Sequence, residues 1–418
     1  MDENELRTAL RQTITLHPEP PPMESGTAIT AARRAQTRRN LLAGIGSAAA
    51  ILGITLAVIP GQARTGGGTD LPVAAEPSGA VQPLPIETPR ATSLSGAAPS
   101  VEHGDLPAGV TVSDADDVEP VLTPFDRVSA LAYGSAAGVT VIEVAPEAEP
   151  AEPVVIRLVG KGGDAAAART FVKVGAFAKA TIVLEQTGSV TLADNIEVVI
   201  GDSAQLTFVT LAEWDSDAVQ AQHVKFRVGR DARVQHVQVT LGGDLVRQFT
   251  SVEYTGRGGD AELWGVYFAN SGQHHEHRQL VDHAVPDCRS YVGYRGALQG
   301  SSAHTVWVGD VLIRAAATGT DTYEINRNLL LTDGARADSV PNLEIETGEI
   351  AGAGHASATG RFDDEQLFYL MARGIPEGEA RKLVVRGFFA ELINKIPVEE
   401  LRERLGDVIE SRLVEAGQ

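Results

Sequence analysis

The sequence contains a single cysteine, Cys288, among 418 residues. One thiol cannot form an intramolecular disulfide, and it cannot build a cysteine-rich zinc or iron–sulfur cage within one chain. We interpret Cys288 as a small buried residue rather than a reactive thiol. Aromatic residues are also scarce at 5%, whereas glycine is abundant with 43 residues. This composition favours tightly turned β-structure over a helical bundle.

Positive charge is in short supply as well. The chain has 35 Lys and Arg residues against 55 Asp and Glu residues, a formal net charge of −20. Because nucleic acids are bound through clustered Lys and Arg, this balance argues against a nucleic-acid partner.

Nucleotide-binding motifs are missing too. No G-x-x-x-x-G-K-S/T motif occurs, so any ATP hydrolysis must come from another chain. Residues 256–261 match the dinucleotide pattern G-x-G-x-x-A, but residues 262–268 predict a strand where that motif requires a helix. We therefore reject a dinucleotide site here.

The first 104 residues differ from the rest and hold 11 of the 21 prolines. We divide them into a polar and basic segment (1–40), an apolar segment (41–60) and a flexible Pro/Gly-rich linker (61–104). The linker composition cannot bury enough apolar surface to offset chain entropy, which predicts disorder. We therefore expect a disordered N-terminal region that contains one apolar helix, formed by residues 41–60.

Residues 41–60 are apolar or small throughout. As a helix they would reach roughly 30 Å, the thickness of a hydrocarbon core. Arginines at 33, 34, 38 and 39 precede them, so the positive-inside rule puts the N-terminus in the cytoplasm. The same run resembles a twin-arginine export signal. Residues 33–63 thus predict membrane tethering or export, with a buried or misassigned segment as the alternative.

From about residue 105 the pattern predicts β-structure. Short alternating runs such as 171–174, 181–184 and 237–241 are typical of strands with one buried face. A weak Gly-x-x-Ala repeat begins at 175, 201, 229 and 258, with spacings of 26, 28 and 29 residues. Near-constant spacing of this length predicts stacked coils, with Gly and Ala at corners where coils approach. We expect a parallel β-solenoid over 105–360, with an antiparallel sandwich as the alternative.

Residues 361–418 are predicted to form a helical domain. An acidic turn at 363–366 opens the first helix, Gly374 ends it and Pro376 begins the next. Two apolar faces at helical spacing follow. They consist of Ala380, Leu383, Val384, Phe388, Leu392 and Ile396, and of Leu401, Leu405, Ile409 and Leu413.

The densest group of potential metal ligands surrounds Glu276 and comprises His274, His275, His277 and His283. On a strand, His275 and His277 would share a face. The spacing matches neither H-E-x-x-H nor a zinc finger, so we interpret these histidines as solvent-facing. Acidic stretches at 114–117 and 346–349 are interpreted as solvated faces. Together with the export-like N-terminus, they leave an exported or tethered carbohydrate-active β-solenoid enzyme as the alternative function.

The most specific signal spans residues 327–374, which read RNLLLTDGARADSVPNLEIETGEIAGAGHASATGRFDDEQLFYLMARG. This segment closely resembles the SufB/SufD family, the scaffold subunits of the Suf iron–sulfur cluster assembly machine. The similarity extends from about residue 105 to the end. It implies a mainly β fold, with a right-handed parallel β-helix core and a C-terminal α-helical domain. It also implies a non-enzymatic role in a cytoplasmic complex of one B-type subunit, one D-type subunit and two copies of a SufC-type ABC ATPase, with a homodimer as a further option.

The resemblance also assigns residues. Two cysteines of B-type subunits correspond to Ala335 and Ile345 here, which implies the D-type. His355 matches a D-type histidine that faces the B-type subunit and is needed for cluster assembly. Its imidazole could ligate iron or accept a proton, or only pack at the interface. The helices that bind the ATPase would include Phe368, Tyr369, Arg373 and Gly374. The implied cargo is a transient iron–sulfur cluster or iron, and reduced flavin is an associated cofactor of the family.

Overall fold

The computed structural model describes residues 94–362 and 364–414. The segments predicted at 1–40 and 41–60, most of the linker and the acidic residue Asp363 lie outside these ranges. Within them, no helix is long and apolar enough to cross a membrane.

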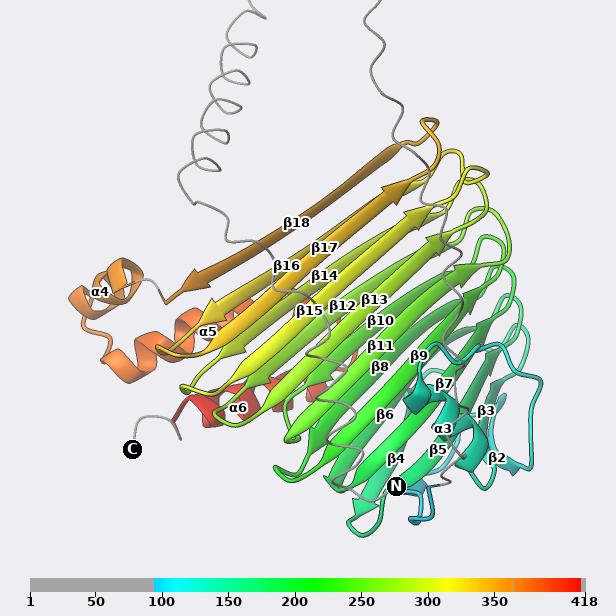
Figure 1. Ribbon diagram of the computed structural model, residues 1–418, viewed down its shortest axis with the longest axis horizontal. Helices are drawn as coiled ribbons and strands as arrows, with labels where there is room; N and C mark the ends of the chain where they lie inside the picture. Colours follow the sequence, from blue (N-terminus) through cyan, green and yellow to red (C-terminus); the bar gives the residue numbers. More distant parts are fainter. Residues whose placement is uncertain (1–93, 363, 415–418) are drawn as a thin grey trace, which may run out of the picture. The chain divides into compact units, whose positions relative to one another are not determined.

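Two facing β-sheets, each of nine strands in the described part of the chain, form a parallel solenoid (Figure 1). In spatial order, sheet A contains β2 (Val110–Ala115), β3 (Val139–Val144), β5 (Ala166–Val174), β7 (Thr191–Ile200), β9 (Val219–Val228), β11 (Leu245–Tyr254), β13 (His274–His283), β15 (His304–Ile313) and β17 (Arg336–Ile345). Sheet B contains β1 (Ser100–His103), β4 (Val154–Lys161), β6 (Lys179–Ser189), β8 (Gln205–Trp214), β10 (Arg233–Thr240), β12 (Asp260–Ala269), β14 (Arg289–Leu298), β16 (Asp321–Leu330) and β18 (Gly352–Arg361). The predicted solenoid is confirmed, and the antiparallel sandwich is wrong.

The two sheets alternate along the chain, so each strand pairs in parallel with the strand two elements later. Val209 of β8, for example, pairs with Val237 of β10, which pairs with Trp264 of β12. Among the described strands, only β1 and β2 pair antiparallel, with β4 and β3 respectively. Strand β1 lies inside the range predicted as linker. Its backbone is ordered there because β4 supplies its hydrogen-bonding partner.

The Gly-x-x-Ala repeats do occupy the corners. A Cβ on Gly175 would lie 2.4 Å from the backbone nitrogen of Pro146, and one on Gly201 would lie 2.7 Å from that of Ala176. Glycine is therefore required for the coils to approach. The alanine of each repeat is completely buried. These residues are Ala178, Ala204, Ala232 and Ala261.

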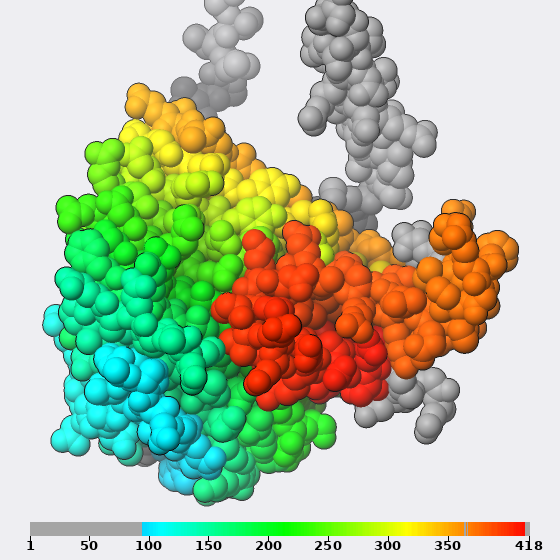
Figure 2. All heavy atoms as spheres, turned by 180° about the vertical axis from the view of Figure 1, so that it is seen from behind, coloured from blue at the N-terminus to red at the C-terminus, as the bar shows by residue number. Residues whose placement is uncertain are grey.

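Three helices follow β18: α4 (Asp364–Ala372), α5 (Glu377–Ile393) and α6 (Glu399–Val414). Figure 2 shows α5 and α6 lying against the coils, while α4 projects at the side of the molecule. Their buried side chains join the outward-facing apolar residues of sheet B, including Val209, Val237 and Trp264, in one hydrophobic cluster. The C-terminal helices therefore bury a face of sheet B that would otherwise be exposed apolar surface.

The apolar face predicted for α6 is confirmed, since Leu401, Leu405 and Ile409 are buried. The face predicted for α5 is partly wrong. Leu383 is 50% exposed, and the buried face is centred instead on Val385 and Phe389. Both candidate faces are apolar, and the contact with sheet B selects between them.

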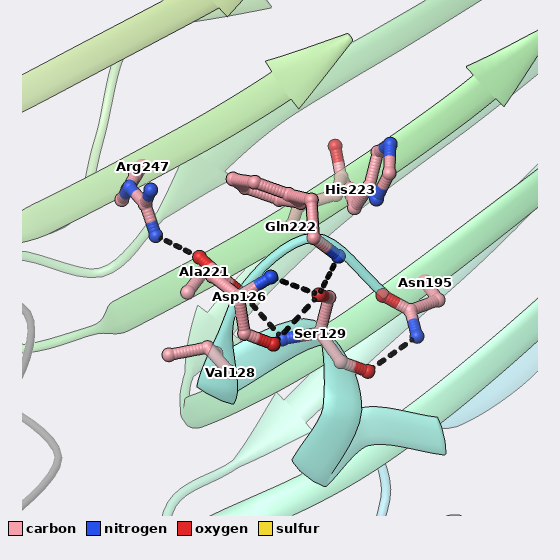
Figure 3. Close-up of a pocket in the computed structure, with 9 residues that line it drawn as sticks. Asp126, Val128, Ser129, Asn195, Ala221, Gln222, His223 and Arg247 are labelled. Atoms are coloured by element: carbon pink, nitrogen blue, oxygen red, sulfur yellow. Dashed lines mark hydrogen bonds and ion pairs between the residues drawn. The ribbon is translucent and has the colours of Figure 1, made fainter. Parts of the chain in front are cut away.

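A further helix, α3 (Arg127–Ser135), lies across the outer face of sheet A (Figure 3). The side chain of its N-cap residue, Asp126, accepts a hydrogen bond from the Ser129 N–H at 2.8 Å and one from Arg247 Nη1 at 2.5 Å. The Asn195 amide donates to the Ser129 carbonyl at 2.9 Å. The cavity among these residues is about 10 Å³, room for no more than a water molecule. We interpret the contacts as fastening α3 to the sheet.

Candidate functional site

The two ends of the solenoid differ in how their edges are covered. At the N-terminal end, the last strands are β1 and β2, which are short and run antiparallel to their neighbours. At the other end, β17 and β18 are ten residues long, and within the described ranges each pairs with only one neighbour. Strand β18 carries no charged residue before Arg361 and no proline. A long strand edge without these features is ready to pair with another chain.

His355 lies on this open edge, in register with Glu324 of β16. Its side chain is 44% exposed, and its Nδ1 is 3.9 Å from Glu324 Oε1. Because side chains alternate along a strand, Ser357 and Thr359 occupy the same face of β18 as His355. The last coil therefore has polar side chains on the face of β18 that carries His355, next to the edge at which another chain could pair.

Glu324 is completely buried beneath this edge. Neither carboxylate oxygen has a hydrogen bond of ordinary geometry in the described structure, and the same holds for Trp307 Nε1 and Ser339 Oγ nearby in the last coils. Burial raises the pKa of Glu324 to about 8, the charge of Asp310 adds to this, and the Asn342 N–H offsets part of it. Unpaired buried polar groups are costly, and within residues 94–362 and 364–414 Glu324 is the one carboxyl group in this state, which makes it a candidate functional residue.

A chain of polar side chains runs through the interior towards the open end. Inward-facing residues of successive coils form hydrogen bonds, and the rings of His277 and Tyr267 stack with centroids 4.7 Å apart. The bonded pairs are Gln222–Asp194, Gln248–Gln222, Thr240–Gln248, Thr240–His277, Tyr267–Asn328, Asn326–Tyr267 and Asn328–Thr359. The solenoid is thus apolar at its corners and polar along part of its axis.

The prediction that the histidines of β13 face solvent is wrong for three of them. His275, His277 and His283 are fully buried, with Nε2 hydrogen-bonded to the Gly242 carbonyl, Thr240 Oγ1 and Ser290 Oγ respectively. Because polar groups of other residues inside the solenoid form hydrogen bonds with these rings, neutral histidine side chains are tolerated at inward-facing positions. Burial accordingly lowers the pKa of His275 to about 3 and that of His283 to about 4. Only His274 lies on the outer face, half-buried, with its Nδ1 3.1 Å from that of His304.

These histidines do not form a metal centre. In residues 94–362 and 364–414, no group of three or more His, Cys, Asp or Glu side chains could hold a metal ion. Cys288 is buried, as predicted, and burial raises the pKa of its thiol, which disfavours the reactive thiolate form.

A buried histidine gives a pH prediction. Burial lowers the pKa of His236 from its usual 6.5 to about 3. Below pH 6.5, His236 is therefore protonated in the unfolded chain but stays neutral in the folded chain. The free energy of unfolding consequently decreases as the pH falls below 6.5. His236→Gln can keep the hydrogen bond to Thr210 without titrating. We expect the stability of wild type relative to the variant to fall by roughly 1.4 kcal/mol per pH unit below 6.5. Urea denaturation between pH 7.5 and 5 measures this, and a difference independent of pH would contradict it.

The residues expected on the ATPase-binding helices lie together on the surface of α4 and directly after its C-terminal end. Phe368 is 73% exposed and Tyr369 is 57% exposed. The Arg373 guanidinium lies over the Tyr369 ring and donates to its hydroxyl at 2.7 Å. Gly374, at φ +86°, ends the helix as predicted. Met371 is also exposed, so the outer side of α4 is an apolar patch.

Sequence reasoning named His355 as a candidate and did not identify Glu324, which the structure places beside it. The only available signal was the alternation T-x-E-x-N-x-N over 322–328. In an ordinary strand that pattern is typical of a solvent-facing side, whereas here it faces the interior.

Comparison with known proteins places this architecture in a family. Residues 157–388 match the family model for the SufBD core domain of the SUF system for FeS cluster assembly. An iron–sulfur cluster assembly SufBD family protein of Mycobacterium tuberculosis is 58% identical over 297 residues, covering 69% of this chain and 75% of the relative. The Mycobacterium leprae protein of that description is 54% identical, covering 69% and 76%. The iron–sulfur cluster assembly protein SufD of Bacillus subtilis is 29% identical over 249 residues, covering 56% of each chain.

These relatives are named as assembly proteins, which favours that role over the carbohydrate-active alternative. The chain belongs to the SufBD family of iron–sulfur cluster assembly proteins.

Proposed function

We propose that this chain is a D-type, non-catalytic scaffold subunit of a Suf machine. It pairs with a B-type subunit through the open edges of β17 and β18 and binds a SufC-type ABC ATPase through α4. One observation carries the proposal most strongly: in the described ranges the solenoid ends in two short antiparallel strands, β1 and β2, at its N-terminal end, and in two ten-residue parallel strands with one neighbour each at the other end. Strand addition at these edges satisfies backbone groups that water would otherwise have to solvate.

The distribution of thiols supports the D-type assignment. The sole cysteine, Cys288, is buried and lies on neither β17 nor β18. Ala335 and Ile345, which resemble the cysteine positions of B-type subunits, cannot carry sulfur. The sulfur-accepting groups would then come from the partner, while this chain contributes nitrogen and oxygen ligands. Iron, or the growing cluster, is the cargo of the complex.

His355 is the residue through which we expect this chain to take part in assembly. Its half-exposed imidazole lies on the edge that pairs with the partner. A neutral imidazole can bind iron or take up a proton. The cytoplasm is the proposed location, since a chain with one buried thiol fits a reducing compartment.

The experiment that tests this function replaces His355 by alanine in the co-expressed complex. Cluster formation, followed by visible absorbance during anaerobic reconstitution, should fall by about tenfold or more. Folding and partner binding should be retained, because the side chain is half-exposed. His103, exposed on β1 at the opposite end, offers a matched control as His103→Ala. Normal cluster formation by the His355→Ala complex would remove His355 from the mechanism.

A further inference from the structure

We propose that Glu324 and His355 form a two-ligand half-site for a divalent transition-metal ion at the open end of the solenoid. The inference rests on the proposed function in one respect, because the partner subunit or its cargo would supply the remaining ligands. It adds a carboxylate that no sequence motif or relative's name assigns.

The first observation is that Glu324 is buried without a hydrogen bond of ordinary geometry. Its side chain is 0% exposed, and both carboxylate oxygens lack a hydrogen bond of ordinary geometry. A carboxylate held this way costs stability of the free chain. The other inward carboxylate of the interior chain, Asp194, accepts hydrogen bonds from Gln220 and Gln222. Glu324 is therefore available for a ligand in a way that Asp194 is not.

The second observation is the space made for the carboxylate. A Cβ on Gly309 would lie 2.3 Å from Glu324 Oε2 and 2.4 Å from the Trp307 ring. Any larger residue at 309 would displace the carboxylate. Glycine on β15 thus keeps Glu324 beneath the edge strand.

The third observation is the distance between the two donors. Glu324 Oε1 and His355 Nδ1 are 3.9 Å apart. Metal–oxygen and metal–nitrogen bonds in proteins are roughly 2.1 Å, and at an octahedral or tetrahedral angle they hold two donor atoms about 3.0 to 3.4 Å apart, so a small side-chain rotation brings both atoms onto one ion. A carboxylate together with an imidazole is a donor set suited to iron(II), manganese(II) and zinc(II).

The half-site is incomplete by itself. In the parts of the chain that the structure describes, no third His, Cys, Asp or Glu joins the pair. His355 is 44% exposed on the side where a partner would pair, which leaves the other coordination positions open to water or to partner groups. We therefore expect weak binding by the chain alone and tighter binding in the complex.

The test is a titration of the purified full-length chain with Co²⁺, whose visible bands report nitrogen and oxygen ligands. Wild type should bind one Co²⁺ saturably. Glu324→Gln, which preserves the side-chain shape, should weaken binding by about tenfold or more. Glu324→Asp keeps a carboxyl group but withdraws it from His355, and should weaken Co²⁺ binding too. Circular dichroism and melting temperature check that each variant is folded.

The control is Glu344→Gln, which removes an exposed carboxylate on β17, and it should bind Co²⁺ like wild type. Binding of Co²⁺ by folded Glu324→Gln with wild-type affinity would overturn the half-site. So would the absence of any saturable Co²⁺ binding by wild type.

Retention of the B-type subunit by the same proteins separates the half-site from the proposed function. If the complex forms but Co²⁺ binding is indifferent to Glu324, the half-site fails and the assembly role stands. If Co²⁺ binding depends on Glu324 but no B-type subunit associates, the half-site stands and the assembly role fails.

Discussion

Gly296→Ala is expected to destabilise the solenoid by about 3 to 5 kcal/mol, through overpacking and the loss of buried hydrogen bonds. A Cβ at 296 would lie 1.9 Å from Cε2 of Tyr267, which pairs with Gly296 across β12 and β14. The Tyr267 ring cannot move aside easily. It is fully buried, its hydroxyl donates to Asn328 Oδ1 at 2.6 Å, and it accepts from Asn326 at 2.8 Å.

The arrangement is reciprocal, because a Cβ on Gly265 would lie 2.0 Å from Tyr294. Each buried tyrosine thus lies over a glycine of the neighbouring coil. The measurement is urea denaturation of Gly296→Ala beside Gly348→Ala. A Cβ on Gly348 meets nothing within 4 Å, so that variant should unfold near the wild-type midpoint. A Gly296→Ala midpoint equal to wild type would show that the interior is looser than the structure indicates.

The second large effect concerns α4. We expect Phe368→Asp combined with Tyr369→Asp to weaken ATPase binding by about a hundredfold or more. Interface aromatic anchors commonly contribute about 2 kcal/mol or more each, and about 1.4 kcal/mol corresponds to tenfold. Both side chains are exposed in the free chain, so the double variant should fold normally. The aspartates would place unpaired charge in the contact.

Phe177 provides a matched control, since it is 59% exposed in the corner between β5 and β6. Phe177→Asp should bind the ATPase like wild type. Surface plasmon resonance with immobilised ATPase measures both affinities. Equal affinity for the α4 double variant and the Phe177 variant would exclude α4 as the binding surface.

Much of the fold could be predicted because it depends on local steric rules. The Gly-x-x-Ala corners recur at coil spacing, since only small residues fit where backbones approach, as at Gly175 and Gly201. The apolar face of α6 was predictable for a similar reason, because only one side of that helix is apolar. The apolar face of α5 was predictable only in part, because Phe388 and Phe389 are equally apolar and only the position of sheet B decides which is buried.

The candidate site was predictable only in part, because inside and outside cannot be distinguished by polarity in this solenoid. His277 and Glu324 carry the side chains of an exposed strand face, yet both are buried. The polarity of His277 is tolerated because Thr240 reaches it from another coil, and the pattern of a single strand contains no information about such a partner. His355 could be placed because it lies within a long motif resembling a known family, and the structure then locates it on an open strand edge.

Native mass spectrometry of the C-terminally tagged chain, co-expressed with the B-type subunit and the ABC ATPase of its own genome, tests the assembly role most directly. We predict a complex that contains this chain, the B-type subunit and the ATPase together. Recovery of the tagged chain alone or only with copies of itself, while both other proteins are soluble in the same lysate, would contradict the assignment as a scaffold subunit.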